Sequence, residues 1–329
     1  RQVSTDRTHR EALLVEIEHA GHVGLGEAAP ISYYRQSLAS AEAALERAVA
    51  LLGNDPFDLE AIHARLTAEI GAESATIAAI DGALHDLIGK LLGLPVWKLL
   101  GLDADRMPLT SFTIGIDDLQ TIAEKTREAE PFPILKIKVG TSHDEAILRT
   151  IREIAPHKTL RVDANCGWSP ERALQEMRRI AAFNVELIEQ PIPPDDPDAM
   201  HRLYAARVAP LFADESCVHE ADVVRCAGRF DGVNIKLSKC GGIRPALRMI
   251  HVARALGLKI MLGCMIETSV GIAAAAQLGP LVDYLDLDGH LLLADDPFEG
   301  LNGTGGLLRL SRQPGIGVRQ KGSTAFGMD

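Results

Sequence analysis

Apolar and polar residues follow two different rhythms along this chain. In the first hundred residues, two alternating runs at 12–18 and 23–27 flank an Ala20-Gly21 pair, which predicts an antiparallel hairpin. Apolar residues then recur every three or four positions, which is typical of amphipathic helices packed on one face. The pattern predicts three helices, at residues 40–52, 56–70 and 74–92.

From about residue 107, short apolar runs rich in β-branched residues alternate with helical segments. The predicted strands are 109–114, 134–139, 160–163, 185–189, 211–214, 233–237, 260–263 and 284–288. Regular alternation of strand and helix indicates a parallel sheet with helical crossovers. Eight such units over roughly 190 residues favour a closed barrel over an open sheet.

The predicted fold class is therefore α/β: a (β/α)7β TIM-like barrel with an N-terminal α+β capping domain. Residues 1–106 are expected to form the capping (lid) domain. Residues 107–299 are expected to form the barrel that carries the site. The eighth strand has no clear helix after it, and the glycine-rich stretch that begins at residue 300 predicts a return of 300–329 to the capping domain.

Composition narrows the class of protein. The chain has 329 residues, 47% of them hydrophobic, and 34 Lys+Arg against 45 Asp+Glu give a net charge of −11. This acidic balance argues against partners such as nucleic acid or an anionic membrane surface, which need a basic footprint. No apolar run reaches the ~18 residues of a membrane span, and no signal peptide is visible. A cytoplasmic protein is expected, and assembly into a homo-oligomer stays open.

The five cysteines are odd in number and form no CxxC pair. A disulfide framework or a structural zinc site is therefore not expected. The stretch from Gly24 to Ala29 matches a dinucleotide-binding fingerprint in letters, but no helix is expected to open there, so a Rossmann site is rejected. Gly241-Gly242 could cradle a phosphate, although a tight strand-to-helix turn is the preferred interpretation.

Charged residues stand at the carboxyl ends of six predicted strands, where a barrel builds its site. They are Lys136, Lys138, Asp163, Glu189, Asp214, Lys236, Asp286 and Asp288. A single acid at a strand end is most often solvated or caps a loop. The same coincidence on six strands instead indicates a common site.

The types of residue suggest a chemistry. Carboxylates on three neighbouring strands form an oxygen cage of the kind that Mg²⁺ prefers, and no His or Cys pair has zinc-ligand spacing. Lysines lie on the strands to either side of this trio. A divalent ion on a substrate carboxylate stabilises the enediolate formed by loss of the neighbouring proton. One lysine can remove that proton and the other can return one to the opposite face, which predicts racemisation or epimerisation.

Several stretches resemble the enolase superfamily in its muconate-lactonizing branch. They are Leu135-Lys136-Ile137-Lys138-Val139, Val162-Asp163-Ala164-Asn165, Ile188-Glu189-Gln190-Pro191, Ala213-Asp214-Glu215-Ser216, and Asn234-Ile235-Lys236 followed by Gly241-Gly242. Enzymes of this superfamily use a Lys or His base, with Mg²⁺ stabilising an ene-diolate, and the resemblance implies the same chemistry here.

The resemblance extends over essentially the whole chain and implies roles for individual residues. Asp163, Glu189 and Asp214 would bind one Mg²⁺ per subunit, and no other cofactor is implied. Lys138 and Lys236 would be the two acid/base catalysts. Lys136 would lie in the substrate site and support Lys138 electrostatically, with Asn165 and Glu215 nearby.

Within this branch, Asp286-Leu287-Asp288-Gly289 looks like the mark of dipeptide epimerases. In those enzymes the two acids hold the α-ammonium of the N-terminal residue, while the C-terminal carboxylate lies on the metal. The resemblance thus implies a dipeptide substrate whose C-terminal residue is inverted at its α-carbon. The plainer interpretation is a polar strand end that closes the barrel.

Loops of the capping domain select the substrate in this family, here residues 3–7 and 30–37. Our register places Thr5 where enzymes for acidic dipeptides can have Arg, with Arg7 two residues on. Tyr33, Tyr34 and Arg35 could form a pocket wall or an exposed loop. Ile266 favours a neutral or apolar substrate side chain.

Other functions compete with the dipeptide epimerase. The nearest are a cycloisomerase, an o-succinylbenzoate synthase and an N-acylamino-acid racemase, whose substrates lack the free ammonium that Asp286 and Asp288 would bind. A more remote alternative is a binding protein that keeps the barrel without catalysis.

Overall fold

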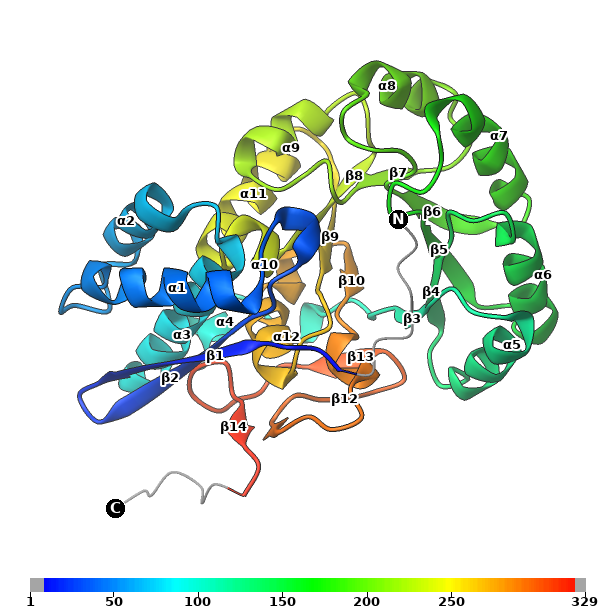
Figure 1. Ribbon diagram of the computed structural model, residues 1–329. Helices are drawn as coiled ribbons and strands as arrows, with labels where there is room; N and C mark the ends of the chain where they lie inside the picture. The colour runs from blue at the N-terminus through cyan, green and yellow to red at the C-terminus, as the bar shows by residue number, and fades with distance from the viewer. Residues whose placement is uncertain (1–8, 323–329) are drawn as a thin grey trace.

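The computed structural model describes residues 9–322, and its centre is an eight-stranded parallel sheet (Figure 1). The neighbouring strands follow the order β10-β9-β8-β7-β6-β5-β4-β3. A further parallel bridge between Thr110 and Leu285 brings the two edges of the sheet together, so the sheet closes as a barrel. The strands are β3 (Phe112–Ile114), β4 (Ile134–Lys138), β5 (Thr159–Asp163), β6 (Val185–Glu189), β7 (Leu211–Ala213), β8 (Gly232–Lys236), β9 (Lys259–Gly263) and β10 (Tyr284–Asp286).

Helices connect each strand to the next and lie around the outside of the sheet (Figure 1). They bury apolar faces against it: α6, for example, buries Ile147, Leu148 and Ile151. The predicted (β/α)7β order is therefore confirmed. The connecting helices are α5 (Leu119–Glu128), α6 (Asp144–Ile154), α7 (Pro170–Ala181), α8 (Pro197–Ala205), α9 (Glu220–Cys226), α10 (Leu237–Cys240) with α11 (Ile243–Ala255), and α12 (Ser269–Ala276).

The N-terminal part forms the predicted hairpin and helices. Strands β1 (Leu13–His19) and β2 (His22–Ala28) pair antiparallel around the Ala20-Gly21 turn. The helices are α1 (Leu38–Ala48), α2 (Leu59–Ile70), α3 (Ser74–Leu92) and α4 (Val96–Leu99). Short 3-10 turns are η1 (Ser32–Tyr34), η2 (Val49–Leu51), η3 (Ala104–Arg106), η4 (Gly279–Leu281) and η5 (Gly289–Leu292).

The glycines of β2 allow this strand to lie directly on α3. A Cβ atom at Gly26 would stand 1.8 Å from the carbonyl oxygen of Ala79, and one at Gly24 would stand 2.0 Å from that of Ala83. The fingerprint-like letters thus serve close packing of a strand on a helix. The rejection of a dinucleotide site agrees with this arrangement.

Several predicted elements end elsewhere because side chains take over backbone hydrogen bonds. Strand β7 ends before Asp214, whose N–H donates to the Gln190 side chain. Strand β10 ends at Asp286, since the next N–H, that of Leu287, donates to the Thr110 hydroxyl. Strand β3 begins only at Phe112.

Two helix starts and one helix end also differ from the prediction. Helix α1 begins at Leu38, where Ser37 and Ser40 form a capping box, and it tightens into η2 after Ala48. Helix α2 starts at Leu59 rather than at residue 56, because the preceding residues form a turn held by Asp55, which accepts from the Phe57 N–H.

The C-terminal segment runs over the N-terminal helices. The Ile316 N–H donates to Asp86 of α3 at 2.8 Å, and the Trp97 indole of α4 donates to the Ser311 carbonyl at 2.9 Å. Its short strands are β11 (Phe298–Glu299), β12 (Asn302–Thr304), β13 (Leu307–Arg309) and β14 (Arg319–Gln320). The exact division into domains at residues 106 and 300 stays a prediction.

All five cysteines are free. Gly241 and Gly242 have φ of +95° and +121° and form the tight turn between α10 and α11, as preferred from the sequence. Within residues 9–322, none of the helices combines the length and the apolar character needed to cross a membrane.

Candidate active site

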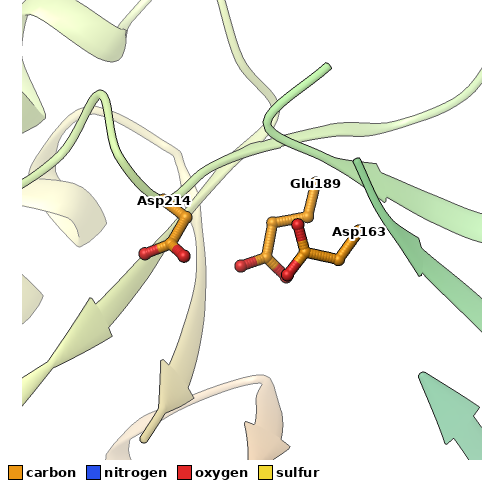
Figure 2. Close-up of side chains that lie close together, drawn as sticks. All are labelled: Asp163, Glu189 and Asp214. Carbon is orange, nitrogen blue, oxygen red and sulfur yellow. The ribbon is translucent and has the colours of Figure 1, made fainter. Parts of the chain in front are cut away.

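Three buried carboxylates meet at the carboxyl end of the barrel. Asp163 ends β5, Glu189 ends β6, and Asp214 follows β7 directly. One oxygen from each lies within 4.8 Å of the others, and all three residues are at most 2% exposed. Figure 2 shows the three carboxyl groups turned into the same space. Successive parallel strands end side by side, so residues far apart in sequence become neighbours here.

Neighbouring polar groups fix these carboxylates. The Asn165 N–H donates to Asp163 Oδ1 at 2.9 Å, and the Asn234 amide donates to Glu189 Oε1 at 2.7 Å. The other oxygen of Glu189, Oε2, is buried and faces the Lys136 ammonium at 2.8 Å. Carboxylate oxygens that converge in an all-oxygen donor set fit a hard divalent cation.

The two candidate catalytic lysines approach this cluster from opposite sides. Lys138, on β4, places Nζ 2.7 Å from Asp163 Oδ2 and 2.9 Å from Asn165 Oδ1. Lys236, on β8, places Nζ 2.8 Å from Asp214 Oδ2. Strands β5, β6 and β7 separate β4 from β8 in the sheet, as predicted.

Lys136 is buried inside the barrel and links the acidic trio to Asp286 at the end of β10. Its Nζ is 2.6 Å from Asp286 Oδ2, 2.8 Å from Glu189 Oε2 and 3.1 Å from Asp163 Oδ2, and its side chain is 2% exposed. The buried carboxylates are therefore compensated by lysine ammonium groups, and they are also suited to a metal ion. The compensation by lysines was not predicted from the sequence.

Electrostatic effects shift the pKa values of the three acids in different directions. Burial by itself raises the pKa of each. For Asp163 the ammonium groups of Lys138 and Lys136 outweigh burial and lower the pKa to about 2. For Asp214, Lys236 and Lys239 likewise hold the pKa below its usual value. For Glu189, burial together with the charge of Asp163 raises the pKa.

Burial lowers the pKa of Lys236, but the charge of Asp214 more than offsets it, so the pKa is raised overall. The same opposition acts on Lys136, where burial is outweighed first by the charge of Asp286 and then by that of Glu189, and its pKa is raised. Both ammonium groups are thus held in the charged form by their acidic neighbours.

Asp286 and Asp288 lie together on the opposite wall from the trio. The Ser111 hydroxyl donates to Asp286 Oδ1 at 2.6 Å, and the Thr113 N–H donates to Asp288 Oδ2 at 2.6 Å. Burial and then the charge of Asp286 raise the pKa of Asp288 to about 6. Burial also acts on Asp286, but Lys136 outweighs it and lowers the pKa.

The capping domain reaches this end of the barrel through η1. The Tyr33 hydroxyl lies 3.9 Å from the Cys166 Sγ in the loop after β5, and the rings of Tyr33 and Tyr34 meet edge to face at 5.1 Å. Burial and the charges of Asp214 and Glu215 raise the pKa of Tyr34. Residues 30–37 therefore border the site, whereas residues 3–7, with Thr5 and Arg7, lie outside the described part of the chain.

Some residues that build the site were not predicted from the sequence. Asn234 orients Glu189, and Lys239 donates to Asp214 Oδ1 at 2.5 Å. Gln190 accepts from the N–H of Asp214, at 3.0 Å. A signal existed for Asn234, which stands two positions before Lys236 and so shares its strand face. Lys239, a charge three positions after Lys236 and just before the Gly241-Gly242 turn, was a second signal.

The sequence of this chain is similar to those of known proteins over most of its length. Residues 118–323 match the family described as "Enolase C-terminal domain-like", and residues 2–101 match "Mandelate racemase / muconate lactonizing enzyme, N-terminal domain". The L-Ala-D/L-amino acid epimerase of Maribacter sp. is 42% identical over 89% of this chain and 86% of its own length. The L-Ala-D/L-Glu epimerase of Bacteroides thetaiotaomicron is 41% identical over 95% of this chain and 82% of its own length.

A solved structure shows the same fold. The dipeptide epimerase of Enterococcus faecalis, complexed with Mg and the dipeptide L-Leu-L-Tyr, superposes with a TM-score of 0.88 at 34% identity. The match covers 94% of this chain and 92% of that one. Sequence and structure together place this chain in the mandelate racemase/muconate lactonizing enzyme family of the enolase superfamily.

Proposed function

We propose that this protein is a Mg²⁺-dependent dipeptide epimerase that inverts the α-carbon of the C-terminal residue by 1,1-proton transfer. The observation that carries the proposal is the placement of Lys138 and Lys236 on opposite sides of a buried carboxylate trio. Relatives at about 40% identity are named as dipeptide epimerases, which are isomerases, and this supports the assignment.

Asp163, Glu189 and Asp214 would hold the metal ion. Their all-oxygen donor set, with one oxygen of each within 4.8 Å of the others, fits Mg²⁺. Bound there, the ion supplies a positive charge that favours loss of a proton next to a carboxylate. Related dipeptide epimerases have been solved as complexes with Mg and a dipeptide, which supports both the metal and the class of substrate.

The two lysines would move the protons. In one direction, the neutral amine of Lys138 takes the α-proton from one face and the ammonium of Lys236 gives a proton to the other. In the reverse direction, the two groups exchange roles. Their separation on β4 and β8 suits this division, since each amine can reach only the face of the α-carbon turned toward it.

Asp286 and Asp288 would bind the substrate ammonium at the other end of the dipeptide. Both are buried, and an ammonium placed between them would compensate their charge. Lys136, 2.6 Å from Asp286, would keep the acids of the two ends in place. Substrates of a cycloisomerase, o-succinylbenzoate synthase or N-acylamino-acid racemase carry no ammonium for this acid pair. A cytoplasmic location and a homo-oligomer stay predictions from the sequence, as does the absence of a nucleic-acid partner.

Proton NMR in D₂O tests the reaction directly. With Mg²⁺ and a set of L,L-dipeptides that includes L-Ala-L-Glu, the α-proton signal of the C-terminal residue should disappear, and EDTA should prevent the loss. Exchange in none of the dipeptides, together with exchange in N-acylamino acids, would replace the epimerase by the racemase alternative. If no substrate of any class exchanges its α-proton, the result would favour the non-catalytic binding protein.

Single-lysine variants separate the two roles. Lys138→Met and Lys236→Met should each abolish epimerisation, while each retains slow exchange for the one epimer whose α-proton faces the remaining lysine. Lys158→Met is a matched control, because its ammonium binds backbone carbonyls of Glu130 and Phe132 at the opposite end of the barrel. Epimerisation that persists in either of the first two variants would contradict the two-lysine mechanism.

A further inference from the structure

Lys239 is a buried lysine that the proposed mechanism does not use. It lies on α10, the single helical turn that follows β8, three residues beyond Lys236. Its side chain is 0% exposed. An unpaired ammonium in such a place would strongly destabilise the fold, so it needs partners of opposite charge or polarity.

Four oxygen atoms surround the Lys239 ammonium. Asp214 supplies Oδ1 at 2.5 Å and its own carbonyl at 2.7 Å. The carbonyls of Asn234 and Cys217 lie at 2.9 and 3.0 Å. These carbonyls belong to β8 and to the loop after β7, so the ammonium is tied to the backbone on two sides of Asp214. Lys239 therefore has no freedom to turn toward the barrel mouth.

The Asp214 carboxylate is consequently divided between two lysines. Oδ1 binds the fixed Lys239, whereas Oδ2 faces Lys236 at 2.8 Å. We propose that Lys239 is a positioning residue of the metal centre: it retains Oδ1 of Asp214, leaves only Oδ2 for the metal ion, and thereby favours Mg²⁺ over the larger Ca²⁺. This inference rests on the metal site of the proposed function.

Ion selectivity follows from how many oxygens a carboxylate can offer. Mg²⁺ demands near-ideal octahedral geometry, whereas Ca²⁺ takes more oxygens and readily accepts both from one carboxylate. An oxygen that accepts from a lysine fixed by three backbone carbonyls is less free to move toward an ion, so binding of Asp214 through both oxygens is disfavoured. Removing Lys239 would free Oδ1 and allow the two-oxygen arrangement that suits Ca²⁺.

The test is a comparison of metal affinities in the wild type and Lys239→Met. Calorimetric titrations with MgCl₂ and with CaCl₂ give the two dissociation constants for each protein. The affinity ratio of Ca²⁺ to Mg²⁺ should rise by about tenfold or more in the variant, because only Ca²⁺ gains from the freed oxygen. A merely structural lysine would lower the melting temperature without changing this ratio.

Lys90→Met is the matched control. Lys90 is also buried and donates to a carboxylate, Asp86, at 2.6 Å and to the Val23 carbonyl at 2.7 Å, but it lies on α3, outside the acidic trio. Its replacement should lower the melting temperature and leave the ratio at the wild-type value. A wild-type ratio in Lys239→Met would overturn the proposal.

A measurement on the unmodified protein covers the case in which Lys239→Met does not fold. In a crystal structure with Mg²⁺ bound, Asp214 should ligate the ion through Oδ2 alone while Oδ1 stays on Lys239. Ligation through Oδ1 would overturn the role of Lys239 and leave the proposed metal site standing. If the wild type binds neither ion, the metal site of the proposed function fails, and the role of Lys239 fails with it.

Discussion

Asp286→Asn separates two tasks that the structure allows for Asp286. This side chain lies 2.6 Å from Lys136 Nζ and accepts from the Ser111 hydroxyl at 2.6 Å. It could therefore bind the substrate ammonium, or it could serve mainly to hold Lys136. Asparagine preserves the volume and removes the negative charge, so the two tasks respond differently.

The expected magnitude follows from the contacts. Lys136 keeps Glu189 at 2.8 Å and Asp163 at 3.1 Å after the change, so its buried charge stays compensated and the protein should remain folded. A substrate ammonium would lose a hydrogen bond to a charged partner, which contributes about 1.5–3 kcal/mol. This loss corresponds to a rise in KM of roughly 10- to 100-fold for a free dipeptide, with a smaller change in kcat.

The assay compares free dipeptides with their N-acetylated forms, which have no ammonium. If Asp286 binds the ammonium, the wild type should prefer the free dipeptide, and Asp286→Asn should lose that preference. If Asp286 acts only through Lys136, kcat/KM should fall by the same factor for both substrates. An unchanged preference would therefore refute the assignment of Asp286 to the dipeptide ammonium.

Three further predictions concern the metal, packing and pH. EDTA should abolish turnover, and added Mg²⁺ should restore it while raising the melting temperature, because the ion binds only the folded trio; unchanged turnover in EDTA would contradict a metal-dependent reaction. Gly26→Ala should sharply lower the melting temperature, whereas Gly21→Ala in the open turn should cost less, since a Cβ at Gly26 would overlap the Ala79 carbonyl; equal melting temperatures would contradict the close packing of β2 on α3. Burial, followed by the charge of Glu27, raises the pKa of Glu267 to about 8 in the folded protein. The protonated carboxyl therefore contributes its full stabilisation below about pH 4.5, and this contribution is lost as the pH rises through about 8. Glu267→Gln should therefore gain stability relative to the wild type between pH 5 and 8.5 in thermal unfolding, and a constant difference would contradict the raised pKa.

The sequence determined the order of elements and most of the candidate site residues. Strands such as β4 and β5 are short apolar runs bounded by turn residues, and their charged ends stand out because charge is rare in such runs. Parallel strands have a fixed direction, so the ends of β5 and β6 had to meet at one rim. For these features local pattern and chain direction suffice.

Element ends were less predictable, because they depend on side chains that arrive from elsewhere. Strand β7 stops where the distant Gln190 side chain takes the Asp214 N–H, and β10 stops where Thr110 takes that of Leu287. The sequence of each strand by itself does not predict these hydrogen bonds, because their acceptors lie elsewhere in the chain. The same holds for the glycines of β2, whose purpose became visible only with α3 packed against them.

Which acidic and backbone groups compensate each lysine was decided by the tertiary structure. From the sequence, Lys136 and Lys138 share a strand face, and Lys236 and Lys239 are three residues apart. In the fold, Lys136 reaches Asp286 across the barrel, and Lys239 is fixed by carbonyls from two segments. A sequence identifies which charges are present, but the partners that compensate each buried charge are set by packing, because electrostatic interactions in a buried site depend on distances of a few ångströms.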